Sequence, residues 1–120
     1  LSAAGRLVMK RGEIWWASPS IPEGSEPGCR RPVVIVQADS FNRSRIQTVV
    51  VAAITSSIRL ADAPGNVLLA RREGHLSRES VVNVSQLLTL DRSFLTGRAG
   101  RLSAASMGAV DEGLHLVLAL

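Results

Sequence analysis

The chain has 120 residues, of which 46% are hydrophobic, and 14 basic against 10 acidic side chains give a formal net charge of +4. This length allows one compact core, and the high hydrophobic content excludes a disordered chain. We therefore expect a single globular domain. The apolar runs are far shorter than the roughly 20 residues that span a bilayer, and the single cysteine cannot form a disulfide within the chain, so we expect a cytoplasmic protein without a membrane helix.

The basic side chains are almost all arginine, 13 of the 14. The planar guanidinium pairs with phosphate and stacks on exposed bases, so this bias fits a nucleic-acid-binding protein. Genomic base composition explains the bias equally well, and the charge alone decides little.

The first eight residues lack the apolar run and the cleavage site of a signal peptide. Met9 and the residues that follow it are typical of a natural start. We therefore expect residues 1–8 to be a leader or a cloning remnant, and residues 9–120 to form the domain.

Residues 12–17 include Ile14, Trp15 and Trp16, which are types that favour a strand. Neighbouring strand residues point to opposite faces, so one tryptophan should be in the core. The other is expected in an interface, or else stacked on a base. Residues 18–28 are rich in proline, glycine and polar residues, and predict a long loop of the kind that carries function.

Two valine-rich runs follow, at residues 33–36 and 48–54, and both are typical of central strands that are buried on both faces. Residues 39–45 between them are polar. Asp39 or Ser40 is placed to cap one short helical turn there.

Further strands are predicted at residues 66–70, 80–87 and 98–102. The apolar period then changes to that of a helix, and Ser103 is placed to cap its start. Five side chains form the helical face expected to pack on the sheet: Met107, Val110, Leu114, Val117 and Leu118. Many short strands with one terminal helix predict a mainly β fold with α additions, in the form of a small, strongly bent barrel.

Several blocks of sequence, in this order, carry a resemblance to a known family: KRGEIW at residues 10–15, GSE at 24–26, RPVVIVQ at 31–37, Asp39, Asn42, AITS at 53–56, Pro64, SV at 80–81, Gln86 and TLD at 89–91. Together they resemble the MazF/PemK toxins of type II toxin-antitoxin systems. The resemblance implies an SH3-like barrel with a C-terminal helix, usually a homodimer, with the active site beside the loop after the first strand.

The resemblance also implies an activity: metal-independent, sequence-specific cleavage of single-stranded RNA, with messenger RNA as the expected target. In this reaction the ribose 2′-hydroxyl attacks the adjacent phosphorus, which requires proton transfer and stabilisation of charge on the phosphate oxygens. The matching catalytic positions are Arg31, just before a proline, and Thr55, at a strand end. Glu26 is a weaker candidate for a base or for an organiser of Arg31.

Each of these residues also has a plainer interpretation. Arg31 could be a solvated arginine, Thr55 a β-branched strand residue and Glu26 a surface carboxylate. Without the family match these plainer interpretations would be favoured. With it, the catalytic roles are favoured for Arg31 and Thr55, while Glu26 stays evenly balanced.

Candidate RNA-binding residues are Arg30, Arg43, Ser56 and Gln86. Two positions depart from the family pattern. Position 88, which is often basic in relatives, is Leu88 here, and Ser85 stands before Gln86, where relatives can have an acidic residue. No Asp, Glu and His cluster has the spacing of metal ligands, and no cofactor is expected.

The expected partners are the RNA substrate and a MazE-like antitoxin whose acidic tail covers the active-site groove and competes with RNA. One alternative keeps the fold but not the chemistry: a non-enzymatic toxin that binds DNA gyrase. A second alternative, an RNA-binding barrel without catalysis, is disfavoured because only 3% of the residues are aromatic and few could stack on bases.

Overall fold

The structure, a computed structural model, describes residues 8–18 and 30–120. Its strands are β1 (Glu13–Ala17), β2 (Arg31–Ile35), β3 (Thr48–Thr55), β4 (Val67–Leu69), β5 (Ser80–Asp91) and β6 (Leu95–Arg101). Its helical elements are α1 (Asp39–Asn42), α2 (Ala104–Leu118) and the short 3₁₀ turns η1 (Ile58–Asp62), η2 (Glu73–His75) and η3 (Arg92–Phe94). The predicted mainly β fold with a C-terminal helix is confirmed.

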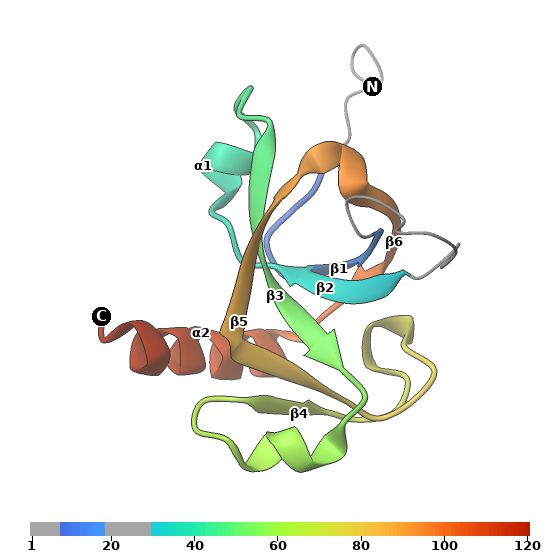
Figure 1. The fold of residues 1–120 in the computed structure, drawn as a ribbon, viewed down its shortest axis with the longest axis vertical. Coiled ribbons are helices and arrows are strands. Elements are labelled where there is room, and N and C mark those ends of the chain that lie inside the picture. The colour runs from blue at the N-terminus through green and yellow to red at the C-terminus, as the bar shows by residue number, and fades with distance from the viewer. Residues whose placement is uncertain (1–7, 19–29) are drawn as a thin grey trace, which may run out of the picture.

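The six strands form one antiparallel sheet in the order β4-β5-β3-β2-β1-β6 (Figure 1). The sheet is sharply bent along β5, where the register against β3 slips between Ala52 and Ala53. Ala52 pairs with Leu87 but Ala53 pairs with Asn83, so three residues of β5 bulge out at the bend. β5 and β6 are both longer than the sequence predicted, because the pattern around residues 88–97 does not alternate.

The sheet buries apolar residues on both of its faces, as predicted for the two valine-rich strands. Val34 belongs to the cluster that faces α2, which also contains Ile14, Val82 and Val110. Val33 and Ile35 point the other way, into a second cluster with Met9, Trp15, Val49 and Val51. β2 and β3 therefore lie between two cores.

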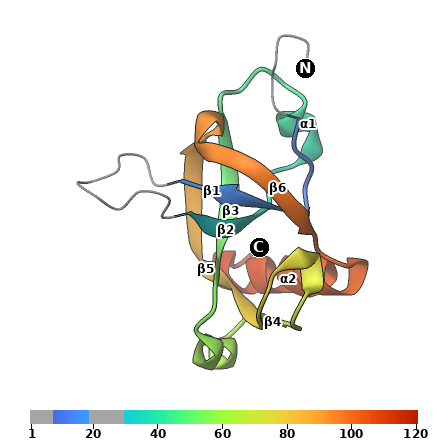
Figure 2. The same cartoon turned by 90° about the vertical axis from the view of Figure 1, so that its right-hand side faces the viewer.

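Helix α2 begins where the sequence predicted, because the Ser103 hydroxyl oxygen accepts a hydrogen bond from the backbone N–H of Ser106 at 3.1 Å. Val110 and Leu114 are buried against the sheet. The prediction was wrong for Val117 and Leu118, which are 40% and 49% exposed. The last turn of α2 extends past the sheet toward the C-terminus, and no strand of residues 8–18 or 30–120 covers it (Figures 1 and 2).

Asp39 does not cap α1, contrary to the prediction, and neither does Ser40, because the N-cap is Ala38 without a side-chain bond. The Asp39 carboxylate instead accepts hydrogen bonds from the backbone N–H of Arg11 at 2.7 Å and from the Asn42 amide at 3.0 Å. These two bonds hold the pKa of Asp39 below its ordinary value. The contact ties α1 to the segment that leads into β1.

The turn at η2 lies in backbone contact with β6. Gly74 has φ of +62°, and a Cβ atom added at Gly100 would collide with the backbone of Gly74. A Cβ atom at Gly74 would collide with the end of the buried Ile14 side chain. The pair of glycines therefore fixes the turn, and with it residues 76–80, against the sheet.

Replacing Gly100 with alanine should force this turn away from β6. We expect Gly100→Ala to lower the free energy of unfolding by about 1–3 kcal/mol, the range typical of overpacking, in urea denaturation. Gly97→Ala is the matched control on the same strand, since nothing lies within 4 Å of a Cβ atom there. Equal stabilities of the two variants would contradict the contact.

Candidate active site

The two residues predicted to be catalytic lie at the ends of neighbouring strands. Arg31 begins β2 and Thr55 ends β3. Val33 pairs with Ala53 in this antiparallel ladder, and continuing the register by two residues sets Arg31 across from Thr55. The sheet therefore brings together two positions that are far apart in the sequence.

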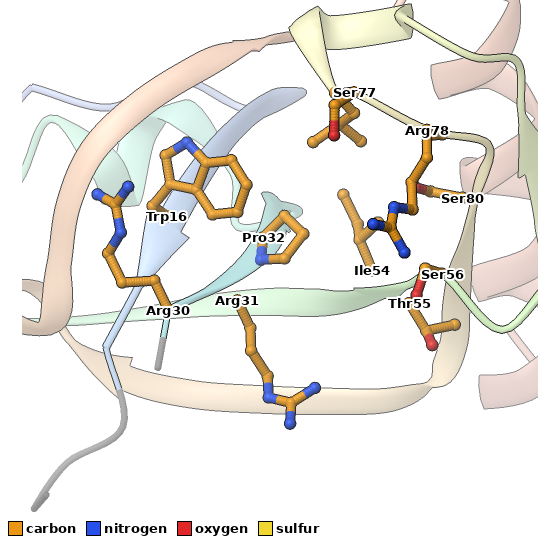
Figure 3. Close-up of a pocket in the computed structure, with 11 residues that line it drawn as sticks. Trp16, Arg30, Arg31, Pro32, Ile54, Thr55, Ser56, Ser77, Arg78 and Ser80 are labelled. Carbon is orange, nitrogen blue, oxygen red and sulfur yellow. The ribbon is translucent and has the colours of Figure 1, made fainter. Parts of the chain in front are cut away.

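A pocket of about 430 Å³ opens at this end of the sheet (Figure 3). Its walls come from β1, from the junction that leads into β2, from the end of β3, and from the segment between η2 and β5. The lining residues are Trp16, Arg30, Arg31, Pro32, Ile54, Thr55, Ser56, Leu76, Ser77, Arg78 and Ser80. Four predicted site residues thus share one pocket: Arg30, Arg31, Thr55 and Ser56.

The two tryptophans point to opposite faces of β1, as predicted. Trp15 is buried, and its indole N–H donates to the Glu13 carboxylate at 3.0 Å. Trp16 is half-buried and lines the pocket, with the Arg30 guanidinium 5.2 Å from the centre of its ring. An aromatic ring with a cation over it is suited to a planar ligand that also carries negative charge.

The pocket is electropositive. Arg30, Arg31 and Arg78 line it, and no carboxylate from residues 8–18 or 30–120 does so. The ion pairs found in that part of the chain, Arg11 with Asp111 and Arg98 with Glu13, lie elsewhere. Arginines without carboxylate partners in a concave site raise the local concentration of anions.

Thr55 is half-buried, and its hydroxyl oxygen accepts a hydrogen bond from the backbone N–H of Ser57 at 3.1 Å. This bond fixes the hydroxyl oxygen in place, and its hydrogen remains available to donate. A fixed hydroxyl donor across from a guanidinium can stabilise negative charge that develops on an oxyanion between them.

Three other site predictions have different outcomes. Glu26 lies outside the described residues. Arg43 follows α1, at the far end of β3, and Gln86 lies in the β5 bulge; neither lines the pocket. Their roles in binding stay predictions.

Ser77, Arg78 and Ser80 were not among the predicted site residues, and for Trp16 stacking on a base was the less favoured of two alternatives. The segment before β5 reaches the pocket because Thr55 pairs with Val81, which brings the start of β5 beside the end of β3. That pairing cannot be read from one sequence. Among the residues that the structure describes, no group of three or more His, Cys, Asp or Glu side chains could hold a metal ion.

The model of the PemK-like, MazF-like toxins of type II toxin-antitoxin systems matches residues 10–118. The chain belongs to this family. It is 47% identical to the endoribonuclease MazF6 of Mycobacterium tuberculosis (strain H37Rv), over 95% of this chain and all of that protein. It is 38% identical to the endoribonuclease EndoA of Bacillus subtilis, over 95% of this chain and 97% of EndoA.

Solved structures agree with the fold of the family. A MazE-MazF structure from Deinococcus radiodurans matches with a TM-score of 0.76 at 23% identity, covering 96% of this chain and 99% of that one. The Mycobacterium tuberculosis toxin MazF-mt6 matches with a TM-score of 0.73 at 25% identity, covering 90% and 97%. In the described part of the chain, no helix is long and apolar enough to cross a membrane.

The positive charge around Trp16 should be visible in fluorescence quenching. We expect iodide to quench Trp16 more strongly than caesium does, because the pocket attracts anions, while buried Trp15 stays protected from both. Trp16→Phe should remove most of the quenchable emission, and Arg30→Gln or Arg78→Gln should reduce the preference for iodide. Equal quenching by the two ions would contradict an electropositive pocket.

Proposed function

We propose that this MazF-type endoribonuclease toxin cleaves single-stranded RNA in the pocket between Arg31 and Thr55, without a metal ion. The observation that supports the site is the β2–β3 register, which sets the backbone positions of Arg31 and Thr55 across from each other, where both residues line a pocket rich in arginine. The MazF6 and EndoA relatives, which match nearly the whole chain, are endoribonucleases.

In the proposed reaction the ribose 2′-oxygen attacks the adjacent phosphorus while the bond to the 5′-oxygen of the next nucleotide breaks. The 2′-hydroxyl loses its proton and the leaving 5′-oxygen gains one, so a cyclic phosphate and a 5′-hydroxyl result. Arg31 stabilises the charge on the phosphate oxygens through its planar fork, and Thr55 donates its hydroxyl hydrogen to one of them. Glu26 is the proposed proton acceptor or organiser of Arg31, because a guanidinium hardly ever gives up its proton.

We further propose that the unpaired bases of a single strand are held beside the reacting phosphate. The half-buried Trp16 ring and the Arg30 guanidinium, which lies over it, are both planar groups on which a base can stack. Ser56 adjoins Thr55 and can donate to a phosphate oxygen. Arg43 and Gln86 would contact RNA farther from the pocket, and their roles rest on the sequence alone.

The proposal includes a partner and a setting. An acidic, MazE-like antitoxin would cover the pocket, since a basic groove attracts carboxylates as well as phosphates. The Deinococcus relative was solved as a MazE-MazF structure. We also propose a homodimer that acts on messenger RNA in the cytoplasm, and thereby stops translation and growth.

Cleavage can be tested with purified protein, excess chelator, and a mixed-sequence single-stranded RNA beside its DNA counterpart. We expect only the RNA to be cut, and Arg31→Ala and Thr55→Val to lower the rate by about 10²–10³-fold, as is typical when one charge-stabilising donor is lost. Thr55→Ser should keep much of the activity, because it keeps the hydroxyl.

Arg45→Ala and Thr89→Val are matched controls, because both residues are exposed and neither lines the pocket. Loss of activity on chelation, or full activity in both site variants, would contradict the proposed mechanism. If a folded wild-type protein leaves varied RNA sequences intact, the gyrase-binding alternative becomes the next hypothesis to test.

Induced expression in bacteria should stop growth when the antitoxin is absent and allow growth when it is co-expressed. Cells that express Arg31→Ala at the same protein level should continue to grow, because this variant should fold but should not cleave RNA. Normal growth on induction of the wild-type chain alone would contradict the role of a toxin in the cell.

A further inference from the structure

A second hollow adjoins the site pocket on the side of the β4–β5 connection. Its volume is about 590 Å³ and its lining residues are Arg71, Ser77, Arg78 and Glu79. Ser77 and Arg78 also line the site pocket, so the two hollows lie next to each other and share these two residues. A chain-like ligand that extends from the site pocket past Arg78 would come next to this second hollow.

The segment that carries these side chains is held by unusual backbone geometry. Arg72 and His75 are not glycines, yet both have left-handed φ values, +77° and +65°. Such conformations persist only where the surroundings hold them, and they are frequent at functional sites. Here the ring of His75 is hydrogen-bonded through Nδ1 to the carbonyl oxygen of Ala99 at 3.0 Å, and Leu76 is buried.

Both ends of the segment are fixed. The Gly74–Gly100 backbone contact holds the turn on β6, and Leu69 and Ser80, which flank the segment in β4 and β5, are buried. The connection therefore presents its basic side chains from a backbone that is already ordered. Ordering the backbone before a ligand arrives lowers the entropy cost of binding.

The charges of the second hollow are suited to a phosphate. Arg71 and Arg78 are exposed, and neither forms an ion pair with the carboxylates of residues 8–18 or 30–120. In Figure 3 the Arg78 side chain points toward Ile54 and Ser56, while the Arg31 side chain extends from β2 in a different direction, away from Arg78. Ser77 lines both hollows, and its hydroxyl can donate a further hydrogen bond.

We propose that Arg78 and Arg71 form a second phosphate subsite, which holds a backbone phosphate of the RNA next to the scissile one. This inference rests on the proposed RNA-cleaving function. Arg78 acts as a binding and positioning residue, and Arg31 with Thr55 still acts on the reacting phosphate. Glu79 lines the same hollow, and its negative charge weakens the subsite and favours release of the product.

The subsite should affect binding more than chemistry, and only for RNA long enough to reach it. With an RNA that the wild-type protein cuts, Arg78→Gln should raise KM about three- to tenfold and leave kcat within twofold. It should also lower the slope of log affinity against log salt by about 0.7, the value for one phosphate contact on a single strand. Glu79→Gln should change KM in the opposite direction.

The experiment uses this RNA with one phosphate at a time replaced by an uncharged methylphosphonate. One neutralised position beside the cleavage site should raise KM for the wild type, and should raise it clearly less in Arg78→Gln, because the contact with Arg78 is already lost and only that with Arg71 remains. Arg45→Gln is the matched control, since it lies before β3 at the end opposite Thr55 and lines neither hollow. Thermal unfolding verifies that each variant is folded.

An unchanged KM in Arg78→Gln would overturn the subsite. A fall in the kcat of Arg78→Gln that is equal for every RNA length would also overturn the subsite, because it would assign Arg78 to the reacting phosphate. A variant that weakens binding of an acidic antitoxin peptide but not of RNA would assign the hollow to the antitoxin and overturn the proposal. If the wild type cuts no RNA, the proposed function fails, and fluorescence anisotropy with labelled RNA still measures whether Arg78→Gln loses affinity.

Discussion

The pairing of β2 with β3 is the constraint on which the site depends. Val34 faces one core while Val33 and Ile35 face the other, so both faces of β2 are committed. A slip of one residue would exchange these faces and would move every apolar side chain of the strand to the wrong core. The same register sets Arg31 across from Thr55. The free energy of core packing therefore also fixes the relative position of the two polar groups.

The rest of the pocket depends on a second constraint, the bend of the sheet at β5. The bulge lets the first half of β5 continue beside β3 while the strand changes direction, and Val81 then pairs with Thr55. The connection before β5 closes the pocket as a wall, because the Gly74–Gly100 contact holds it close to β6. One wall of the site is thus formed by hydrogen-bonded strand pairing between β3 and β5. The other is held by the backbone contact between Gly74 and Gly100.

The sequence predicted the elements whose signal is local. Valine-rich runs marked the central strands, the change of period marked α2, and Ser103 marked its start; the family resemblance then assigned Arg31 and Thr55. The errors have a common physical cause. The role of Asp39 depends on Arg11, 28 residues away. The exposure of Val117 depends on where the sheet ends, and the place of Arg78 in the pocket depends on strand pairing. None of these is encoded in a local pattern.

The floor of the site pocket has a consequence for which substitutions the site can accept. Trp16 packs against the α2-facing core cluster, and Ile54 belongs to it, so these residues serve stability and ligand binding together. Arg30, Ser56, Ser77 and Arg78 are exposed at the rim, where substitutions cost little stability. In the proposed site, single substitutions at the rim would therefore change ligand preference while the fold is kept. A substitution of Trp16 or Ile54 would in addition disturb the packing of the core.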